Sequence, residues 1–163
     1  MLDIKITNAK TRKTGKELVE IGIENGKITA IAPSVEGEAK QVIDAKGKLV
    51  TESFVNGHLH LCKVYTLEMA GQDALKEYND NNMGGAMTSI ERAADFKACY
   101  DEKWIIENVR KACDLAVKYG NTHIRAFADV DSKARLEGVK AVIRGREEYK
   151  DRLDIQVVAF PQD

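Results

Sequence analysis

The sequence predicts a mixed α/β fold in which a small β unit is followed by alternating strands and helices. The first fifty residues contain short runs that alternate between polar and apolar residues, which is the period of half-buried strands. Beyond about residue 50 the apolar period switches repeatedly between that of a strand and that of a helix, as in parallel βα units. We therefore expect two parts, a small β-sandwich-like unit at 1–50 and an α/β part at 51–163.

Four short strands are expected in the N-terminal unit. The alternating or apolar runs lie at 2–6, 18–23, 27–31 and 42–45. Asn25 and Gly26 separate the second run from the third, and Asn-Gly is a strong hairpin signal because both residues tolerate positive φ. The second and third strands should therefore form a hairpin.

Two amphipathic helices are expected in the second part. The first has apolar residues at intervals of four, three and four, at Ile105, Val109, Ala112 and Ala116. Asp101 can cap its start, and Gly120 can supply the left-handed residue at its end. The apolar positions of the second helix are Leu136, Val139 and Ile143, with Asp131 or Ser132 as its cap.

The stretch from 61 to 88 shows neither period and contains several glycines. We expect it to be a long connection, and such connections in compact domains are often functional. A further short helix is expected at about 89–97.

Three strands of the second part, at 54–61, 122–130 and 154–162, each have one face suited to packing against helices and one more polar face. In the first strand we assign Val55, Leu59 and Leu61 to the helix side and Phe54, Asn56, His58 and His60 to the other. Parallel strands with helices outside and polar faces inside predict a (β/α)₈ barrel. Since a complete barrel takes about 250 residues, we expect only its first three βα units, an incomplete barrel.

Two of the three histidines, His58 and His60, lie two residues apart in the first of these strands. Residues two apart on a strand point to the same side, about 6–7 Å apart along the backbone, which suits two ligands of one metal ion. Asp129 and Gln162 also lie late in their strands on the inner faces, so the four side chains should converge where barrel enzymes place their chemistry. The alternatives are ordinary hydrogen-bonded histidines and an exposed loop position for Gln162.

Several other polar residues have a structural alternative. His123 begins its strand and is expected to form an ordinary hydrogen bond. Arg125 shares a face with Asp129, so Asp129 either pairs with Arg125 inside the barrel or belongs to the pocket. Lys63 is either a solvated or ion-paired loop residue or a pocket residue.

Composition narrows the ligand class. The net charge is −1 with 31% charged residues of both signs interspersed, which argues against nucleic acid and favours a small compact ligand. No apolar stretch is long enough for a signal peptide or a membrane span, so we expect a cytoplasmic protein. The three cysteines show no Cys-x-x-Cys spacing, so we expect neither a disulfide framework nor a zinc knuckle.

The run Phe54-Val55-Asn56-Gly57-His58-Leu59-His60 resembles the "Phe-Val-x-x-His-x-His" signature at the first barrel strand of the amidohydrolase superfamily. The stretches 122–130 and 153–162, the latter with Val-Ala-Phe-Pro-Gln, are similar to the second and third barrel strands of the cytosine deaminase and N-isopropylammelide hydrolase subgroup. The resemblance covers essentially the whole chain.

The resemblance implies that His58 and His60 are the first two ligands of a catalytic divalent metal, zinc or iron, and that Gln162 hydrogen-bonds the ring amide of the substrate. The implied reaction is hydrolytic loss of ammonia or an amine from a cyclic base or amide, with the pKa of the metal-bound water lowered to about 7. The remaining ligands and the proton-shuttling residues are implied to lie beyond residue 163. Phe127 stands where the subgroup has a histidine and Cys62 where it has an aspartate, which implies an altered pocket.

Two hypotheses follow. The first is the N-terminal portion of a metal-dependent amidohydrolase or deaminase, inactive by itself because catalytic zinc sites usually have three protein ligands. The second is a non-catalytic oligomeric module that retains the first half of the fold. In either case a three-stranded parallel sheet leaves an open edge, so we expect a homo-oligomer or association through that edge.

Overall fold

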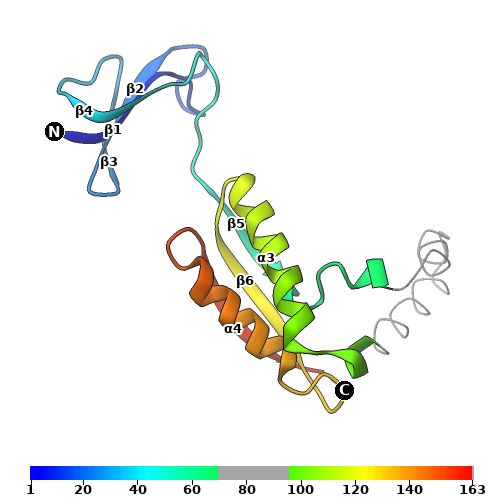
Figure 1. Ribbon diagram of the computed structural model, residues 1–163. Coiled ribbons are helices and arrows are strands. Elements are labelled where there is room, and N and C mark those ends of the chain that lie inside the picture. The colour runs from blue at the N-terminus through cyan, green and yellow to red at the C-terminus, as the bar shows by residue number, and fades with distance from the viewer. Residues whose placement is uncertain (70–95, 163) are drawn as a thin grey trace, which may run out of the picture. The chain divides into compact units, whose positions relative to one another are not determined.

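The computed structural model describes residues 1–69 and 96–162 of the chain (Figure 1). It is a mixed α/β structure with two compact units, Met1–Glu52 and Ser53–Asp163. Most of the long connection expected over 61–88, and most of the helix expected at 89–97, lie outside the described residues.

The first unit is a single four-stranded sheet. Its strands are β1 (Leu2–Ala9), β2 (Val19–Glu24), β3 (Lys27–Ala32) and β4 (Ala39–Asp44), in the order β3-β2-β1-β4. The expected hairpin joins β2 to β3, and Asn25 and Gly26 both have positive φ, 52° and 71°. All four strands join one sheet, so the sandwich-like arrangement expected for this unit is not seen within Met1–Glu52.

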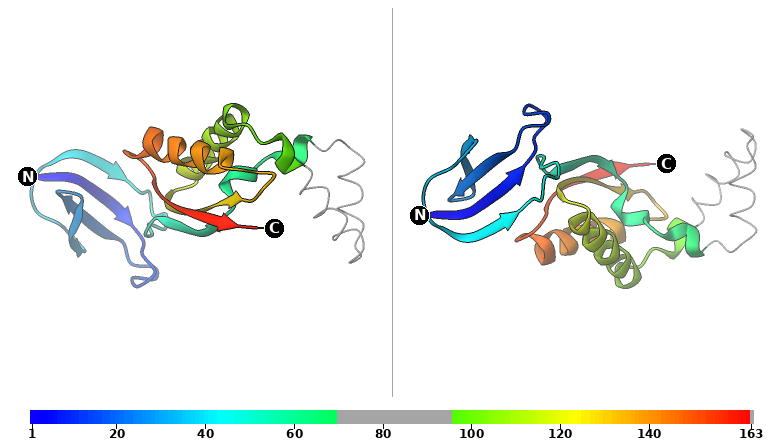
Figure 2. Two further views of the ribbon diagram at one scale, coloured as in Figure 1. Left: turned by 90° about the horizontal axis from the view of Figure 1, so that it is seen from below. Right: turned by 90° about the horizontal axis from the view of Figure 1, so that it is seen from above.

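The second unit contains three parallel strands covered on one face by two helices (Figures 1 and 2). The strands are β5 (Phe54–Leu59), β6 (Asn121–Val130) and β7 (Asp154–Pro161), in the order β5-β6-β7. The helices are α3 (Glu102–Lys118) and α4 (Glu137–Tyr149). Short 3-10 helices lie between β5 and α3: η1 (Leu61–Lys63), η2 (Thr66–Met69) and η3 (Lys97–Cys99).

Helix α3 has the ends and the buried face that the sequence predicts. The Asp101 carboxylate accepts the backbone N–H of Lys103 at 2.8 Å, and Gly120 follows the helix with φ 80°. Ile105 and Val109 are fully buried in the core beneath it.

The face predicted for helix α4 is wrong at two of its three positions, whereas Val139 packs against the core as expected. Leu136 and Ile143 are 53% and 40% exposed. The buried positions are instead mostly small: Gly138, Ala141, Val142, Gly145 and Tyr149. They allow α3 and α4 to approach closely, because a Cβ at Gly145 would lie 2.5 Å from Val109 Cγ1. The predicted cap is also wrong: the Asp131 carboxylate accepts N–H groups of the preceding turn, and the N-cap residue is Leu136.

Strand β6 has the two faces expected of it. Ile124, Ala126 and Ala128 are buried beneath the helices, while His123 and Arg125 on the opposite face are exposed. We call this second face, which the helices do not cover, the open face.

Strand β5 differs from the expected alternation. Val55 pairs with His123, Asn56 with Ile124, and Leu59 with Ala126. Because paired residues of neighbouring strands share a face, Val55 lies on the open face and Asn56 on the helix side, the reverse of our assignment.

A β-bulge explains the reversal. From Asn56 to Leu59 the chain advances three residues, whereas the partner strand advances only two, from Ile124 to Ala126. The extra residue changes the phase of the alternation. His58 and His60 therefore lie on the open face, although Asn56 does not.

Candidate metal and substrate site

His60 and Asp129 meet at the carboxyl ends of β5 and β6. Nδ1 of His60 donates to Oδ1 of Asp129 at 3.0 Å. The Asp129 side chain is 0% exposed and that of His60 is 22% exposed. A buried carboxylate that binds one ring nitrogen fixes the tautomer and orientation of the imidazole, so Nε2 of His60 remains available to a ligand.

Two lysines offset the cost of burying the Asp129 carboxylate. Nζ of Lys63 donates to Oδ2 at 2.9 Å, and Nζ of Lys97 lies 3.8 Å from the same oxygen. The pairing of Arg125 with Asp129 that the sequence left open is not formed, since Arg125 Nε donates to Gln156 Oε1. Lys63 is thus ion-paired with Asp129.

The two imidazoles lie side by side. The ring centroids of His58 and His60 are 5.2 Å apart with an interplanar angle of 63°. His58 stacks on Phe127 at 4.3 Å between centroids, and His60 meets the ring of Phe160 edge to face at 5.2 Å. Two phenylalanines therefore hold both rings in place on the open face.

This geometry fits two ligands of one divalent ion. Imidazoles that bind one zinc ion through nitrogens at about 2.0–2.1 Å have ring centres about 5 Å apart, close to the separation of His58 and His60. Burial, and then the nearby Lys63 ammonium, lower the pKa of His60 despite the Asp129 carboxylate. A lowered pKa favours the neutral imidazole that a metal requires.

The ligand set of the described residues is incomplete. Within 1–69 and 96–162, no group of three or more His, Cys, Asp or Glu side chains could hold a metal ion. A catalytic zinc site usually has three protein ligands. His58 and His60 therefore fit as two ligands of a larger set.

Gln162 joins the site through a residue that the sequence interpretation missed. Its Oε1 accepts from Lys97 Nζ at 2.7 Å, and the same ammonium donates to Asp131 Oδ2 at 2.7 Å. Lys97 is only 9% exposed. Little in the sequence points to Lys97, because it ends the short helix expected at about 89–97 and belongs to no recognisable motif.

Cys62 packs against Asp129 in the core. It is buried, and its Sγ accepts the backbone N–H of Asp129 at 3.3 Å. Burial raises the pKa of the Cys62 thiol, so this side chain is a neutral packing residue. His123 lies at the other end of the sheet, where its Nε2 is 3.9 Å from an exposed Asp154, and it does not join the site.

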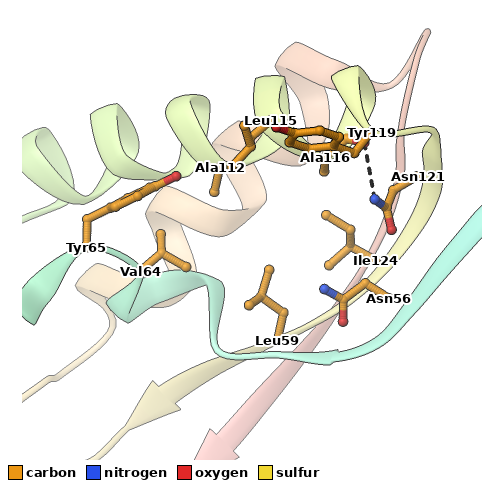
Figure 3. Close-up of a pocket in the computed structure, with 10 residues that line it drawn as sticks. All are labelled: Asn56, Leu59, Val64, Tyr65, Ala112, Leu115, Ala116, Tyr119, Asn121 and Ile124. Atoms are coloured by element: carbon orange, nitrogen blue, oxygen red, sulfur yellow. Dashed lines mark hydrogen bonds between the residues drawn. The ribbon is translucent and has the colours of Figure 1, made fainter. Parts of the chain in front are cut away.

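A separate apolar hollow of about 380 Å³ lies on the helix side of the sheet, between β5 and α3 (Figure 3). Leu59, Val64 and Ile124 point into it. Since His58 and His60 are on the opposite face, this hollow is separate from the pair of imidazoles. Among the described residues, none of the helices has the length and apolar character needed to cross a membrane.

Comparison with known proteins shows similarity over most of the chain. Residues 41–163 match the model of the amidohydrolase family. N-isopropylammelide isopropyl amidohydrolase of Pseudomonas sp. (strain ADP) is 34% identical over 160 residues, which are 98% of this chain and 38% of that protein. The chain thus spans less than half the length of this relative.

Solved structures show the same fold over the matched part. The 5-methylcytosine deaminase of Klebsiella pneumoniae, liganded with phosphonocytosine, has a TM-score of 0.75 at 25% identity, covering 96% of this chain and 36% of that one. An adenosine deaminase of Xanthomonas campestris with bound zinc has a TM-score of 0.61 at 13% identity, covering 98% and 43%. The similarity to the second protein shows the fold alone.

Proposed function

Because the chain belongs to the amidohydrolase family, we propose that it is part of a metal-dependent hydrolase that removes ammonia or an amine from a cyclic amide or amidine. The observation that carries this proposal is the pair of rings of His58 and His60, 5.2 Å apart, with Asp129 buried behind one of them. The proposal is also supported by the 34% identical N-isopropylammelide isopropyl amidohydrolase and by the structural similarity to a 5-methylcytosine deaminase.

The proposed roles of the metal-binding residues follow from their contacts. His58 and His60 would hold a divalent ion, zinc or iron, and Asp129 keeps the proton of His60 on Nδ1. When bound, the ion would supply a water of lowered pKa as nucleophile and polarise the carbon under attack. Lys63 pairs with Asp129 at the edge of the same site, which makes both of them candidate pocket residues.

The proposed substrate surface is aromatic with one amide. Phe127 and Phe160 form an edge-to-face pair with centroids 5.5 Å apart on the open face. Such rings offer flat apolar walls to a planar heterocycle. Gln162, at the end of β7, would hydrogen-bond the ring of the substrate.

We further propose that β5, β6 and β7 are the first three strands of a (β/α)₈ barrel, with a domain boundary near residue 50. The third protein ligand and the proton-transfer residues would then come from strands other than these, so residues 1–163 by themselves would be inactive. The proposed compartment is the cytoplasm, where thiols such as those of Cys62, Cys99 and Cys113 stay reduced.

Metal-dependent release of ammonia or amine tests the proposed function. The protein as its gene encodes it is loaded with zinc or iron and supplied with cytosine and with N-isopropylammelide. We expect turnover of at least one ring, its loss with a chelator, and a loss of at least about 100-fold in His58→Ala, because removing a metal ligand disables the site. His123→Ala, at the other end of the sheet, is the matched control and should retain activity. Unchanged turnover in His58→Ala would contradict the proposal.

A second candidate is a non-catalytic oligomeric module. It is favoured by β5 and β7, each of which pairs with only one other strand among the described residues, so each presents an open edge. This candidate predicts oligomers that grow with concentration in light scattering and no bound metal by elemental analysis. A monomer with stoichiometric metal would exclude it.

A further inference from the structure

The buried Lys97 ammonium donates two hydrogen bonds and lies within ion-pair distance of a second carboxylate. It donates to Asp131 Oδ2 and to Gln162 Oε1, both at 2.7 Å, and lies 3.8 Å from Asp129 Oδ2. An ammonium group only donates hydrogen bonds, so the atom of the Gln162 amide that faces it must be the oxygen. The orientation of this amide therefore follows from the chemistry of its partner.

Lys97 is itself held in place. The Asp131 carboxylate accepts the backbone N–H groups of Lys133 at 2.9 Å and Ala134 at 2.7 Å. Burial alone would raise the pKa of Asp131, but these N–H groups and the Lys97 ammonium outweigh it and lower the pKa. Asp131 is thus a fixed negative partner for Lys97.

The backbone of Gln162 is fixed as well, because its N–H donates to the carbonyl of Val130 at 3.0 Å. With Oε1 bound by Lys97, the free part of the side chain is the Nε2 group and its two N–H donors. Within 1–69 and 96–162, no acceptor contacts Nε2 of Gln162. A flipped amide would place Nε2 against the Lys97 ammonium. This flip would lose a charge-assisted hydrogen bond and bring two donors together.

We propose that Lys97 is a positioning residue that locks the Gln162 amide with Nε2 outward, so that the enzyme selects rings with a hydrogen-bond acceptor at that position. The acceptor would be an exocyclic carbonyl oxygen of the ring, such as the oxo group of cytosine. A ring that presents N–H or an amino group there would leave donors unpaired and be rejected, and such mismatches are costly in buried sites. This inference rests on the proposed function, in which Gln162 contacts the substrate.

Cytosine and 2,4-diaminopyrimidine make a matched pair of probes. Both carry an amino group at C4, but the oxo group of cytosine, an acceptor, is replaced by a second amino group, a donor. Binding of each ring to the metal-loaded protein, as its gene encodes it, is measured by calorimetry. We expect wild type to favour cytosine by at least about 100-fold.

Lys97→Met frees the amide to rotate, so the preference for cytosine should fall at least about tenfold. Lys97→Arg keeps a cationic donor and should retain most of the preference for cytosine. Lys140→Met, which removes an exposed lysine paired with Glu137 on α4, is the control for loss of a lysine and should leave the preference unchanged.

Gln162→Glu tests the same inference if Lys97→Met fails to fold. One carboxylate oxygen can keep the contact with Lys97 while the other faces the ring as an acceptor, so the preference should reverse toward 2,4-diaminopyrimidine. A wild-type protein that binds both rings equally, or an unchanged preference in folded Lys97→Met or in Gln162→Glu, would overturn this inference alone. Binding of neither ring would overturn the proposed substrate class and this inference with it.

Discussion

The two ends of the β5-β6-β7 sheet carry the same kinds of side chain in very different surroundings. At the carboxyl end, His60 and Asp129 are 3.0 Å apart and Asp129 is 0% exposed. At the amino end, His123 and Asp154 are 3.9 Å apart and the Asp154 side chain is 77% exposed. Residue type alone therefore does not make a site.

The difference comes from the chain that covers the carboxyl end. Cys62 of η1 packs against Asp129 and accepts a hydrogen bond from its backbone N–H. Lys97 of η3 forms ion pairs with Asp129 and Asp131 and donates a hydrogen bond to Gln162. At the amino end, Arg125 and Gln156 bond each other near solvent. Burial makes each polar group at the carboxyl end dependent on a partner, so substitutions there should have much larger effects.

The largest effect is expected from Asp129→Asn. The change removes the negative charge between His60, Lys63 and Lys97, and breaking a buried ion pair costs about 3–5 kcal/mol. Asp154→Asn is the matched change at the amino end and should lower the free energy of unfolding by less than about 0.5 kcal/mol. The measurement is urea unfolding of both variants, and equal losses would refute the contrast between the two ends.

The next largest effect is expected on metal affinity. His60→Ala should weaken zinc binding at least about 100-fold because it removes a ligand together with its link to Asp129. His123→Ala should bind zinc as wild type does. Equilibrium dialysis with elemental analysis gives both affinities, and equal weakening by the two changes would place the metal elsewhere.

Two glycines of α4 test whether the helix layer supports the carboxyl end. A Cβ at Gly138 would lie 2.9 Å from Cys62 Cβ, and one at Gly145 would lie 2.5 Å from Val109 Cγ1. Each Gly→Ala change should lower the free energy of unfolding by about 1–3 kcal/mol through overpacking. The better helix propensity of alanine should offset this loss by up to about 1 kcal/mol.

Only Gly138→Ala should also weaken zinc binding, by several-fold, because it displaces Cys62 beneath Asp129. Thermal unfolding and zinc titration separate the two effects. If Gly145→Ala weakened zinc binding as much, the support would come from α4 as a whole and not from Cys62.

The smallest effect is expected from Arg125→Met. Its hydrogen bond to Gln156 is exposed, so stability should change by no more than about 0.5 kcal/mol and zinc affinity should not change. Calorimetric unfolding checks the first value and zinc titration the second. A loss as large as that of Asp129→Asn would mean that the amino end is also a buried polar cluster.

The parts of the structure that follow from local chemistry could be predicted. Asn25 and Gly26 set the hairpin through positive φ, and Asp101 caps α3 through its own carboxylate. The meeting of His60 with Asp129 could also be expected, because parallel strands bring their carboxyl ends to one edge of a sheet.

The parts of the structure that depend on tertiary packing could not be predicted from the sequence. The bulge in β5 depends on its register against β6, and only that register shows that Asn56 and His58 lie on opposite faces. The buried face of α4 depends on how closely α3 approaches, which favours Gly145 over Ile143. The role of Lys97 depends on residues far away in sequence that meet only in the folded chain.

Anomalous X-ray diffraction at the zinc edge, from crystals of the zinc-loaded protein, tests the central claim most directly. The account predicts a peak within about 2.0–2.1 Å of Nε2 of His60 and of a ring nitrogen of His58, with Asp129 still bonded to Nδ1 of His60. A peak bound to other side chains, with none between the two imidazoles, would contradict it.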